Sequence, residues 1–242
     1  MAAVEDEMWY YRALHAHIER ELMQGLGEAG GAGSERRVLD AGCGTGGLVR
    51  RLEGRHPTWR WTAVDVEPLA IELARARCGA TLVQASVTAL PFERETFDAV
   101  VLADVLYHVD DDAAALREAA RVLRPGGLAI VNVPAHRWLW SYHDVTVHGL
   151  RRYERRELRA KVGGAGFDVR RATHWNTLPL PLVAMRRKFL PAPRSGSDVR
   201  LYPAAVEALL RSGMAIERAW IGAGASFPLG SSLLAVGRKP AR

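Results

Sequence analysis

The glycine-rich segment VLDAGCGTGG, residues 38–47, constrains the fold of this chain more than any other stretch. Glycine lets the chain turn tightly and approach a ligand closely, and a helix that starts after such a turn offers free N–H groups. Gly42, Gly44 and Gly47 satisfy the GxGxxG pattern of dinucleotide-binding loops, whereas Gly42, Gly44 and Gly46 satisfy GxGxG. The loop therefore predicts a ligand at the end of a strand, but it does not decide which ligand.

The loop belongs to a series of alternating strand-like and helix-like segments. Strands are expected at residues 37–39, 61–66, 80–84, 97–103 and 128–133, with helices at 47–53, 68–77 and 111–123. Such alternation predicts a parallel sheet with helices on both faces, whose ligands bind beyond the carboxyl ends of the strands. Further on, a helix is expected at 153–162 and strands at 167–173 and 232–237.

Two aspartates narrow the class of cofactor. Asp40 comes just before the glycines, where a carboxylate would repel a pyrophosphate but could accept hydrogen bonds from an ammonium group. Asp65 ends the second expected strand, about twenty residues beyond the loop, where a carboxylate takes the ribose hydroxyls in this architecture. Asp40 thus favours an amino-acid-bearing cofactor over NAD, while Asp65 fits either class.

Five segments resemble the motifs of class I S-adenosylmethionine-dependent methyltransferases, in the bacterial type 11/12-like group. They are VLDAGCGTGG at 38–47, VDVEP at 64–68, ALPF at 89–92, FDAVVLADVLYHV at 97–109 and LREAARVLRPGG at 116–127. The resemblance implies a Rossmann-like α/β fold with a seven-stranded, mostly parallel sheet and helices on both faces. It also implies an enzyme of class EC 2.1.1.- with S-adenosyl-L-methionine as its cofactor. It says almost nothing about the acceptor.

The resemblance implies roles for the residues at matching positions. Asp40 would order the loop and the methionine ammonium region, and Asp65 would take the ribose hydroxyls. Ser86 stands where the family often has an acidic residue for the adenine amine, and the backbone around Val87 could compensate for a weaker contact. The implied cofactor-binding residues are Asp40, Gly42, Cys43, Gly44, Gly46, Asp65, Val66, Ser86, Val87, Ala103 and Asp104.

The same resemblance divides the chain into four parts. Residues 1–33 would form an N-terminal helical lid and linker, 34–174 the cofactor-binding core, 175–229 a helical cap or insertion, and 230–242 the final strand and tail. The segment MWYYRALHAHI resembles the HWWFRAR-like stretch of one subset, and its aromatic residues could cover the cofactor or simply pack on the core. The insertion could be a pocket cap, a dimer surface or a membrane-facing amphipathic element.

The segment SYHDVTVHGLRRY, residues 141–153, resembles the hD…gHxRRY part of that subset, which lies beside the acceptor. A hydroxyl acceptor needs a base, and a histidine with a pKa near 6.5 is suited to that task. We take His143 as the first candidate for catalysis, followed by His108 and Tyr107. Arginines of this segment could hold an anion or only tie the next helix, expected to begin at Tyr153, to the sheet. Acceptor contacts are predicted for Trp9, Tyr10, His136, Arg151, Arg152 and Tyr153.

Charge is spread unevenly along the chain. Residues 1–133 carry 14 Lys and Arg against 20 Asp and Glu, a net −6, whereas residues 134–242 carry 19 against 7, a net +12. A basic half suits a phosphate or carboxylate, a membrane surface or a nucleic acid, or it is a solvated arginine-rich face. The DPPY or NPPY motif of base-amine methylation is absent, so no nucleic-acid partner is expected.

Metal binding and export are not expected either. His143, Asp144 and His148 would make a poor oxygen cage for magnesium, so we expect no metal. The acidic N-terminus does not resemble a signal peptide, and no uncharged apolar run is long enough to span a membrane. Two cysteines without a CxxC pair indicate reduced thiols. The expected location is the cytoplasm.

These features predict an S-adenosylmethionine-dependent methyltransferase that acts on an O or N atom of a small, anionic or polar metabolite, such as a natural product or a sugar-linked compound. One alternative is a methyltransferase that acts on a lipid-linked glycan at the membrane surface, with peripheral membrane contact. Another is a cofactor-binding protein with a rewired activity other than methyl transfer. The sequence leaves open whether the protein is a monomer or a homodimer.

Overall fold

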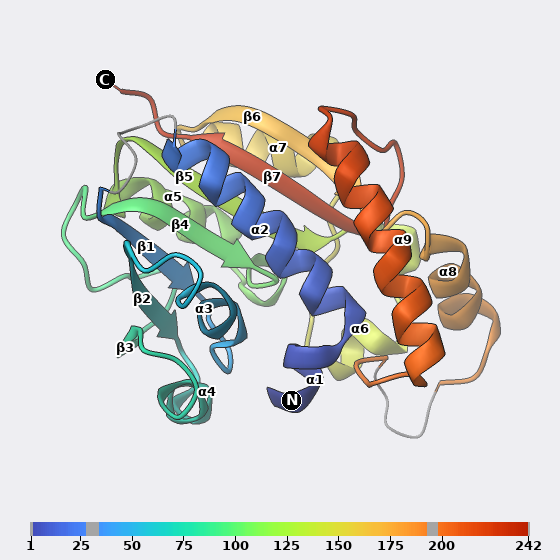
Figure 1. Ribbon diagram of the computed structural model, residues 1–242. Helices are drawn as coiled ribbons and strands as arrows, with labels where there is room; N and C mark the ends of the chain where they lie inside the picture. Colours follow the sequence, from blue (N-terminus) through green and yellow to red (C-terminus); the bar gives the residue numbers. More distant parts are fainter. Residues whose placement is uncertain (1, 28–33, 193–197, 242) are drawn as a thin grey trace.

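A seven-stranded sheet forms the centre of the computed structural model, which describes residues 2–27, 34–192 and 198–241. The strand order is β3-β2-β1-β4-β5-β7-β6, in which the first five strands are parallel and β7 runs antiparallel to both of its neighbours (Figure 1). The predicted seven-stranded, mostly parallel sheet is therefore confirmed. The strands are β1 (Arg36–Ala41), β2 (Trp59–Asp65), β3 (Thr81–Gln84), β4 (Phe97–Ala103), β5 (Leu123–Pro134), β6 (Asp168–Trp175) and β7 (Ser232–Arg238).

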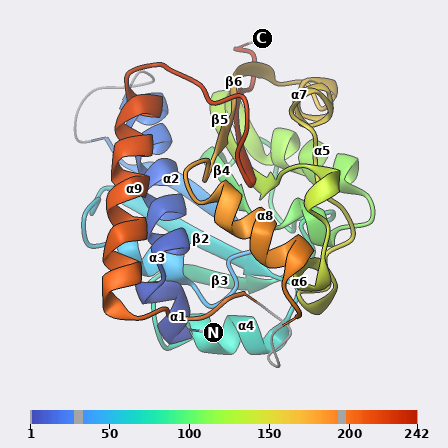
Figure 2. The ribbon, with the colours of Figure 1, turned by 90° about the vertical axis from the view of Figure 1, so that its right-hand side faces the viewer.

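Helices cover both faces of the sheet. α2 and α9 lie side by side on one face, and α5 and α7 lie on the other (Figure 2). The helices are α1 (Ala2–Glu7), α2 (Trp9–Gly27), α3 (Gly47–Leu52), α4 (Pro68–Arg75), α5 (Asp112–Val122), α6 (Tyr142–Thr146), α7 (Arg155–Gly164), α8 (Leu180–Phe189) and α9 (Ala204–Gly222), with short 3-10 turns η1 (Leu106–His108) and η2 (Arg137–Leu139). None of these described helices is long and apolar enough to cross a membrane.

The central strand β4 explains why the core has two layers. Its residues alternate between the two faces, so Ala99 and Val101 pack with the α2 side while Val100 and Leu102 pack with the α5 side. All four are fully buried, which is why this strand reads as a continuous apolar run. Its carboxyl end, like those of its parallel neighbours, points toward the part of the molecule where α6 and α8 lie (Figure 1).

Several element boundaries differ from the sequence expectations. β5 begins at Leu123 instead of residue 128, because Leu123 pairs with Phe97 ahead of the glycine pair. α4 ends at Arg75, and α7 begins at Arg155 because Tyr153 forms an isolated bridge with Ala135. The linker predicted at the end of residues 1–33, the glycine-rich stretch from residue 25 to residue 33, lies largely outside the described residues, since α2 continues to residue 27 and residues 28–33 are not described.

The N-terminal segment is more deeply integrated than a lid would be. Ile18 and Leu22 of α2 are fully buried against the sheet, so most of this helix is a layer of the core. Glu5 of α1 and Tyr10 in the first turn of α2 reach the glycine loop and the end of β4, and His17 of α2 contacts Trp175 at the end of β6. The segment 175–229 contains α8 and α9, and α9 packs along α2.

Candidate cofactor and acceptor site

The glycine loop joins β1 to α3 at the carboxyl edge of the sheet. Gly42 and Gly44 have φ values of 90° and 52°, a region that L side chains rarely adopt. A Cβ on Gly42 would lie 2.2 Å from Cγ2 of Val105, so this turn has no room for a side chain. A Cβ on Gly44 would meet nothing within 4 Å, so the loop leaves open space on that side. The loop can therefore lie directly against a ligand.

Asp65 is held rigidly at the end of β2. Its Oδ2 accepts a hydrogen bond from the Gly44 N–H at 2.9 Å, and its Oδ1 accepts one from the Glu67 N–H at 3.0 Å. The carboxylate thus joins the glycine loop to the neighbouring strand end. Val66, next to it, is largely exposed, as a residue lining an open site would be.

Asp40 is a buried carboxyl group with a raised pKa. Its side chain is buried, with 2% of the residue exposed, and no described residue forms a hydrogen bond with its carboxyl group. Burial, reinforced by the nearby charges of Glu5 and Asp65, raises the pKa of Asp40 to about 8. A cation placed here would be stabilised by three carboxylates, and the ammonium group of an amino acid is such a cation.

An acidic residue of α1 also reaches the glycine loop, which the sequence did not lead us to expect. Glu5 accepts hydrogen bonds from the Thr45 hydroxyl group and from Arg77, the latter at 3.0 Å. A Cβ on Gly47 would lie 2.3 Å from Cδ of Glu5, so the carboxylate lies at the start of α3. The cluster VEDE, residues 4–7, was the only sequence signal for this contact.

Asp104 occupies the carboxyl end of β4 in a strained backbone conformation, with a φ of 54°. Its carboxylate accepts hydrogen bonds from the Tyr10 hydroxyl group at 2.9 Å and from Nδ2 of Asn132 at 2.8 Å. Removal from water raises the pKa of Asp104 to about 6, although both hydrogen bonds lower it. The indole N–H of Trp175 donates to Oδ1 of Asn132 at 2.7 Å and completes the network.

This network brings two predicted site residues together and adds two that were missed. Tyr10, predicted to contact the acceptor, and Asp104, predicted to bind the cofactor, are directly hydrogen-bonded. Asn132 and Trp175 were missed, although a lone asparagine in the apolar strand AIVNVP is a detectable signal of a buried polar contact. Tyr107 lies close enough to Asp104 that burial and this charge both raise its pKa.

The other predicted cofactor residues lie along the same edge. Ala103 directly precedes Asp104 at the end of β4, and the Cys43 N–H donates to Val64 O at 2.9 Å. Burial raises the pKa of the Cys43 thiol. Ser86 forms a hydrogen bond with the Thr88 hydroxyl group at 2.8 Å, in the turn after β3 where Val87 is buried.

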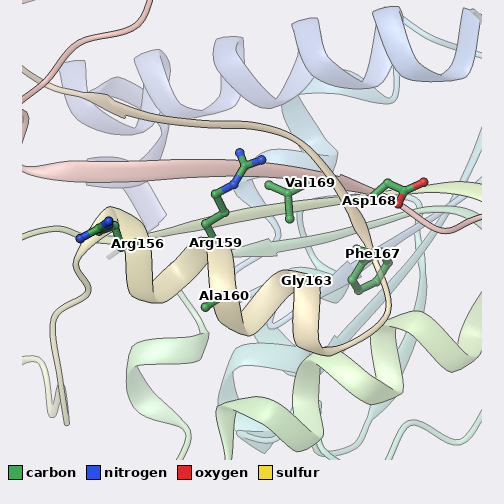
Figure 3. A pocket seen from close by; sticks show the side chains of 7 residues that line it. All are labelled: Arg156, Arg159, Ala160, Gly163, Phe167, Asp168 and Val169. Atoms are coloured by element: carbon green, nitrogen blue, oxygen red, sulfur yellow. The ribbon is translucent and has the colours of Figure 1, made fainter.

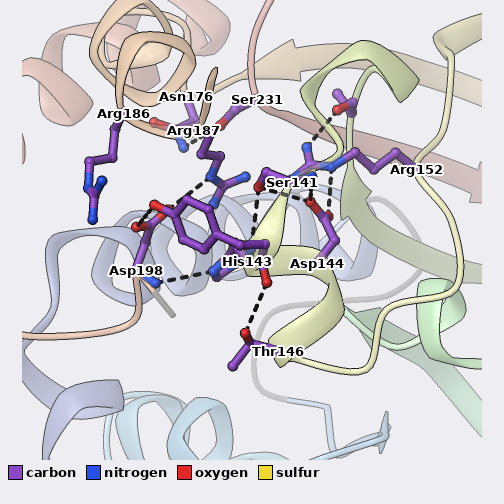
Figure 4. A network of polar contacts seen from close by, with 12 residues as sticks. Ser141, His143, Asp144, Thr146, Arg152, Asn176, Arg186, Arg187, Asp198 and Ser231 are labelled. Atoms are coloured by element: carbon purple, nitrogen blue, oxygen red, sulfur yellow. Dashed lines mark hydrogen bonds and ion pairs between the residues drawn. The ribbon is translucent and has the colours of Figure 1, made fainter. Parts of the chain in front are cut away.

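The acceptor-side segment is built around a buried ion pair (Figure 4). Nε of Arg152 donates to Oδ1 of Asp144 at 2.7 Å, and each side chain is only 2% exposed. Arg152 also donates to the carbonyl of Ala135 at 2.9 Å. Oδ2 of Asp144 accepts from the Ser141 N–H at 2.9 Å, within a capping box that starts α6. Arg152, predicted to bind the acceptor, is therefore occupied in holding α6 on the end of β5.

His143 faces the segment that links α8 to α9. Its Nδ1 accepts a hydrogen bond from the Asp198 N–H at 3.3 Å, so this ring nitrogen carries no proton. Burial, followed by the charge of Arg187, lowers the pKa of His143 to about 4. Asp198 in turn binds Arg187 at 3.0 Å and the Tyr142 hydroxyl group at 2.8 Å (Figure 4). The imidazole is thus neutral near pH 7.

Tyr153 and Arg151 both bind α5. Tyr153 is fully buried and donates to Oδ2 of Asp112 at 2.7 Å, so it has no exposed atom with which to contact an acceptor, and it does not begin a helix. Arg151 pairs with Asp112 at 3.4 Å and donates to the carbonyl of Asp110. These contacts attach the segment before α7 to the start of α5, and contact of Arg151 with the acceptor stays a prediction.

The remaining predicted residues have separate environments. Nδ1 of His108 lies 3.1 Å from the carbonyl of His148, and the backbone of Tyr107 accepts from the Leu150 N–H. His136 is buried and stacks on His174 with ring centroids 4.8 Å apart. The N–H of Trp9 donates to a carboxylate oxygen of α9 at 2.9 Å, and its ring is buried. Among the described residues, no three His, Cys, Asp or Glu side chains converge as metal ligands would.

An open groove between α7 and β6 lies away from this region. It is lined by Arg156, Arg159, Ala160, Gly163, Phe167, Asp168 and Val169 (Figure 3). α7 covers the face of the sheet opposite α2, whereas the glycine loop leads into α3 on the α2 side. The groove is therefore no part of the candidate site.

Comparison with known proteins finds related methyltransferases. Residues 39–131 match the family described as a methyltransferase domain. Over 153 residues, 56% of this chain and 43% of the relative, the chain is 31% identical to 2-methyl-6-phytyl-1,4-hydroquinone methyltransferase 2, chloroplastic, of Oryza sativa subsp. japonica. Over the matched part, the chain is similar to class I S-adenosylmethionine-dependent methyltransferases. The chain spans about half the length of the curated relatives it matches.

Solved structures show the same fold. The methyltransferase bound to the Haloferax volcanii activator Trm112 has a TM-score of 0.62 and 20% identity, with 99% of this chain and 93% of that chain covered. The [4+2]-cyclase SpnF has a TM-score of 0.58 and 20% identity, with 92% and 81% covered. The predicted fold is confirmed, and the match to the methyltransferase domain supports the predicted enzyme class and cofactor, while the HWWFRAR and gHxRRY subset stays a prediction.

The residues present fit S-adenosylmethionine. The buried Asp40 carboxyl group lacks a hydrogen-bond partner among the described residues and lies where an ammonium group would supply one. Asp65 is fixed on the glycine loop, and the open side of Gly44 leaves room for a ligand. Asp40, Asp65 and the loop backbone are therefore the residues that would hold the cofactor.

Proposed function

We propose that this protein transfers a methyl group from S-adenosylmethionine to an O or N atom of a small, anionic or polar metabolite. The observation that carries the proposal is the buried, unpartnered Asp40 carboxyl group beside a glycine loop fixed by Asp65. When bound, the cofactor supplies a methyl group that is already activated on a sulfonium. The protein therefore has mainly to bind, align and exclude water, and about 7–11 kcal/mol of a barrier can come from such positioning.

The residues that would perform this task lie at the carboxyl ends of four neighbouring strands, β1 to β4. Asp40 would pair with the ammonium group, Asp65 would accept from the ribose hydroxyls, and the turn of Ser86 and Val87 would meet the adenine. Asp104 lies at the end of β4, where its carboxylate accepts a hydrogen bond from the hydroxyl group of Tyr10. The basic residues 134–242, with a net charge of +12, support an anionic acceptor.

A hydroxyl acceptor would also need a base, and we propose His143 first. Its Nδ1 accepts the Asp198 N–H, so in the neutral ring Nε2 carries the proton and Nδ1 is the nitrogen that could take another, once the Asp198 N–H has moved away. A lowered pKa keeps the ring in the basic form at neutral pH but makes it a weak base. His108 and Tyr107, at the end of β4, are the next candidates.

Binding and turnover test this proposal separately. Calorimetry with S-adenosylhomocysteine should show one site that Asp65→Ala weakens strongly and that Glu67→Ala, two residues away and exposed, leaves intact. Formation of S-adenosylhomocysteine from S-adenosylmethionine should then appear with a panel of anionic and polar metabolites. Unchanged turnover in His143→Ala would remove His143 as the base. Absence of S-adenosylhomocysteine binding would remove the proposal itself.

A cofactor-binding protein with an activity other than methyl transfer is a second candidate, because SpnF, a [4+2]-cyclase, shares the fold. In that case an acceptor would be converted without formation of S-adenosylhomocysteine. The membrane-surface alternative, with a lipid-linked glycan as acceptor, is supported by the basic half of the chain and by the hydroquinone named for the rice relative.

A further inference from the structure

Helix α8 exposes an apolar stripe beside the candidate acceptor site. Leu182, Met185 and Phe189 are 59%, 48% and 83% exposed. Their spacing of three and four residues places them on one face of the helix. Three large apolar side chains aligned in this way are unusual for a surface that meets only water, and they indicate a partner.

The opposite side of α8 is anchored by polar contacts, so the orientation of the stripe is fixed. Arg187 pairs with Asp198, which also accepts from the hydroxyl group of Tyr142 on α6. Nζ of Lys188, which lies at the edge of the stripe and not opposite it, also donates to the carbonyl of Trp140 at 2.9 Å. These contacts attach α8 to α6 and to the turn that follows β5, and α8 lies toward the viewer in Figure 2.

Cationic and aromatic side chains flank the stripe. Arg186 lies with its guanidinium 5.6 Å from the ring centroid of Tyr142, and Lys188 is exposed on the other side of the stripe. Trp138 and Trp140 are both exposed on the turn that α8 contacts. Apolar side chains bordered by cations and tryptophans are the composition of elements that lie in the interface of an anionic bilayer.

Helix α9 provides an internal comparison. Leu209, Ile216 and Trp220 form an exposed apolar stripe there as well. The two arginines of α9, Arg211 and Arg218, are half-buried, and none of its exposed residues is charged. An exposed cation beside an exposed apolar stripe is therefore found on α8, at Lys188, and not on α9.

We propose that α8, together with Trp138 and Trp140, docks on the surface of an anionic lipid bilayer. Leu182, Met185 and Phe189 would enter the boundary between headgroups and acyl chains, while Arg186 and Lys188 pair with phosphate or carboxylate headgroups. Because α8 is tied to α6, docking turns the carboxyl edge of the sheet toward the membrane. That this delivers a membrane-resident acceptor rests on the proposed function, whereas the docking itself does not.

Vesicle sedimentation with the full chain tests the docking. We expect binding to vesicles of phosphatidylcholine mixed with phosphatidylserine, weak binding to phosphatidylcholine alone, and release by salt. The triple variant Leu182→Ser, Met185→Ser and Phe189→Ser should lower the partition coefficient at least about tenfold. The control Leu209→Ser with Ile216→Ser, on α9, should leave it unchanged.

Charge variants test the electrostatic part independently. Each cation near an anionic surface contributes roughly a fivefold change in partition, so Arg186→Gln with Lys188→Gln should lower binding at least about tenfold at low salt. Arg156→Gln with Arg159→Gln removes two exposed cations of α7, on the other face, and should have little effect.

Three results would overturn the docking. The first is no binding of the wild type to the mixed vesicles, and the second is an equal loss in the α9 or α7 controls. The third is a dimer that only the α8 variants dissociate in light scattering, without vesicle binding, because a second copy would then be the partner. Calorimetry with S-adenosylhomocysteine should be unchanged in every variant, so a failure of the proposed function would show there and nowhere else.

Discussion

The buried carboxyl group of Asp40 predicts how stability depends on pH. Its pKa is about 8 in the folded protein and about 3.9 in an unfolded chain, so the folded state binds the extra proton between these values. The stabilisation is fully present below the unfolded pKa and is lost as pH rises through the folded one. Between these limits wild type should lose about 1.4 kcal/mol per pH unit relative to Asp40→Asn, which cannot titrate.

Urea unfolding followed by circular dichroism measures this slope without any cofactor. From about pH 5.5 to about pH 7.5 the difference in unfolding free energy between wild type and Asp40→Asn should change by about 2.7 kcal/mol. Asp110→Asn, which removes an exposed carboxylate on the same edge, should show no such change. A difference that stays constant across this range would refute the assignment of a raised pKa to Asp40.

Binding of the cofactor should release the proton that Asp40 carries in the free protein. At pH 7 a group with a pKa of about 8 is about nine-tenths protonated, so an ammonium group that pairs with ionised Asp40 must displace that proton. Calorimetry of S-adenosylhomocysteine binding, repeated in buffers of different ionisation enthalpy, measures the number of protons released on binding. Wild type should release about 0.9 proton more than Asp40→Asn. Equal proton release in the two proteins would place the ammonium group elsewhere.

Three further changes test the architecture of the site through urea unfolding. Gly42→Ala should lower the unfolding free energy by roughly 2–4 kcal/mol, whereas Gly44→Ala, with a positive φ but open space around its Cβ, should lower it clearly less. Asp144→Asn should cost about 3–5 kcal/mol because it leaves Arg152 buried without a counter-charge, and the double variant Asp144→Leu with Arg152→Met should recover much of that loss. Tyr153→Phe removes a buried hydroxyl group that donates at 2.7 Å and should cost about 1–3 kcal/mol while S-adenosylhomocysteine binding is retained.

The parts of the fold that the sequence predicted are those encoded locally. β4 is recognisable because four consecutive buried residues give an uninterrupted apolar run, and the glycine loop because its turn excludes side chains. Asp40 and Asp65 were found because their positions relative to that loop follow from the order of strand and helix. The start of β5 was missed because pairing of Leu123 with Phe97 overrides the turn chemistry of RPGG.

The contacts that could not be predicted join segments far apart in the chain. Glu5 meets Thr45 across 40 residues, and Tyr10 meets Asp104 across 94. Nothing in either short segment specifies its partner, because the approach depends on where α1 and α2 cross the strand ends. Asn132 is an intermediate case: its polarity within β5 predicts a buried hydrogen bond but not that Trp175 donates it.

The segment SYHDVTVHGLRRY shows why residue type alone misplaces function. Its most polar pair, Asp144 and Arg152, is buried and holds α6 against β5, a stabilising role that surface-like composition disguises. The sequence could have predicted the role of Asp144 at the start of α6, since Ser141 and Asp144 have the spacing of a capping box. Because that pair is internal, the residues of the segment that reach the α8 side are Tyr142 and His143, both through Asp198. One polar network therefore joins the acceptor edge to the proposed membrane surface. A substitution in either region should alter the position of the side chains in the other.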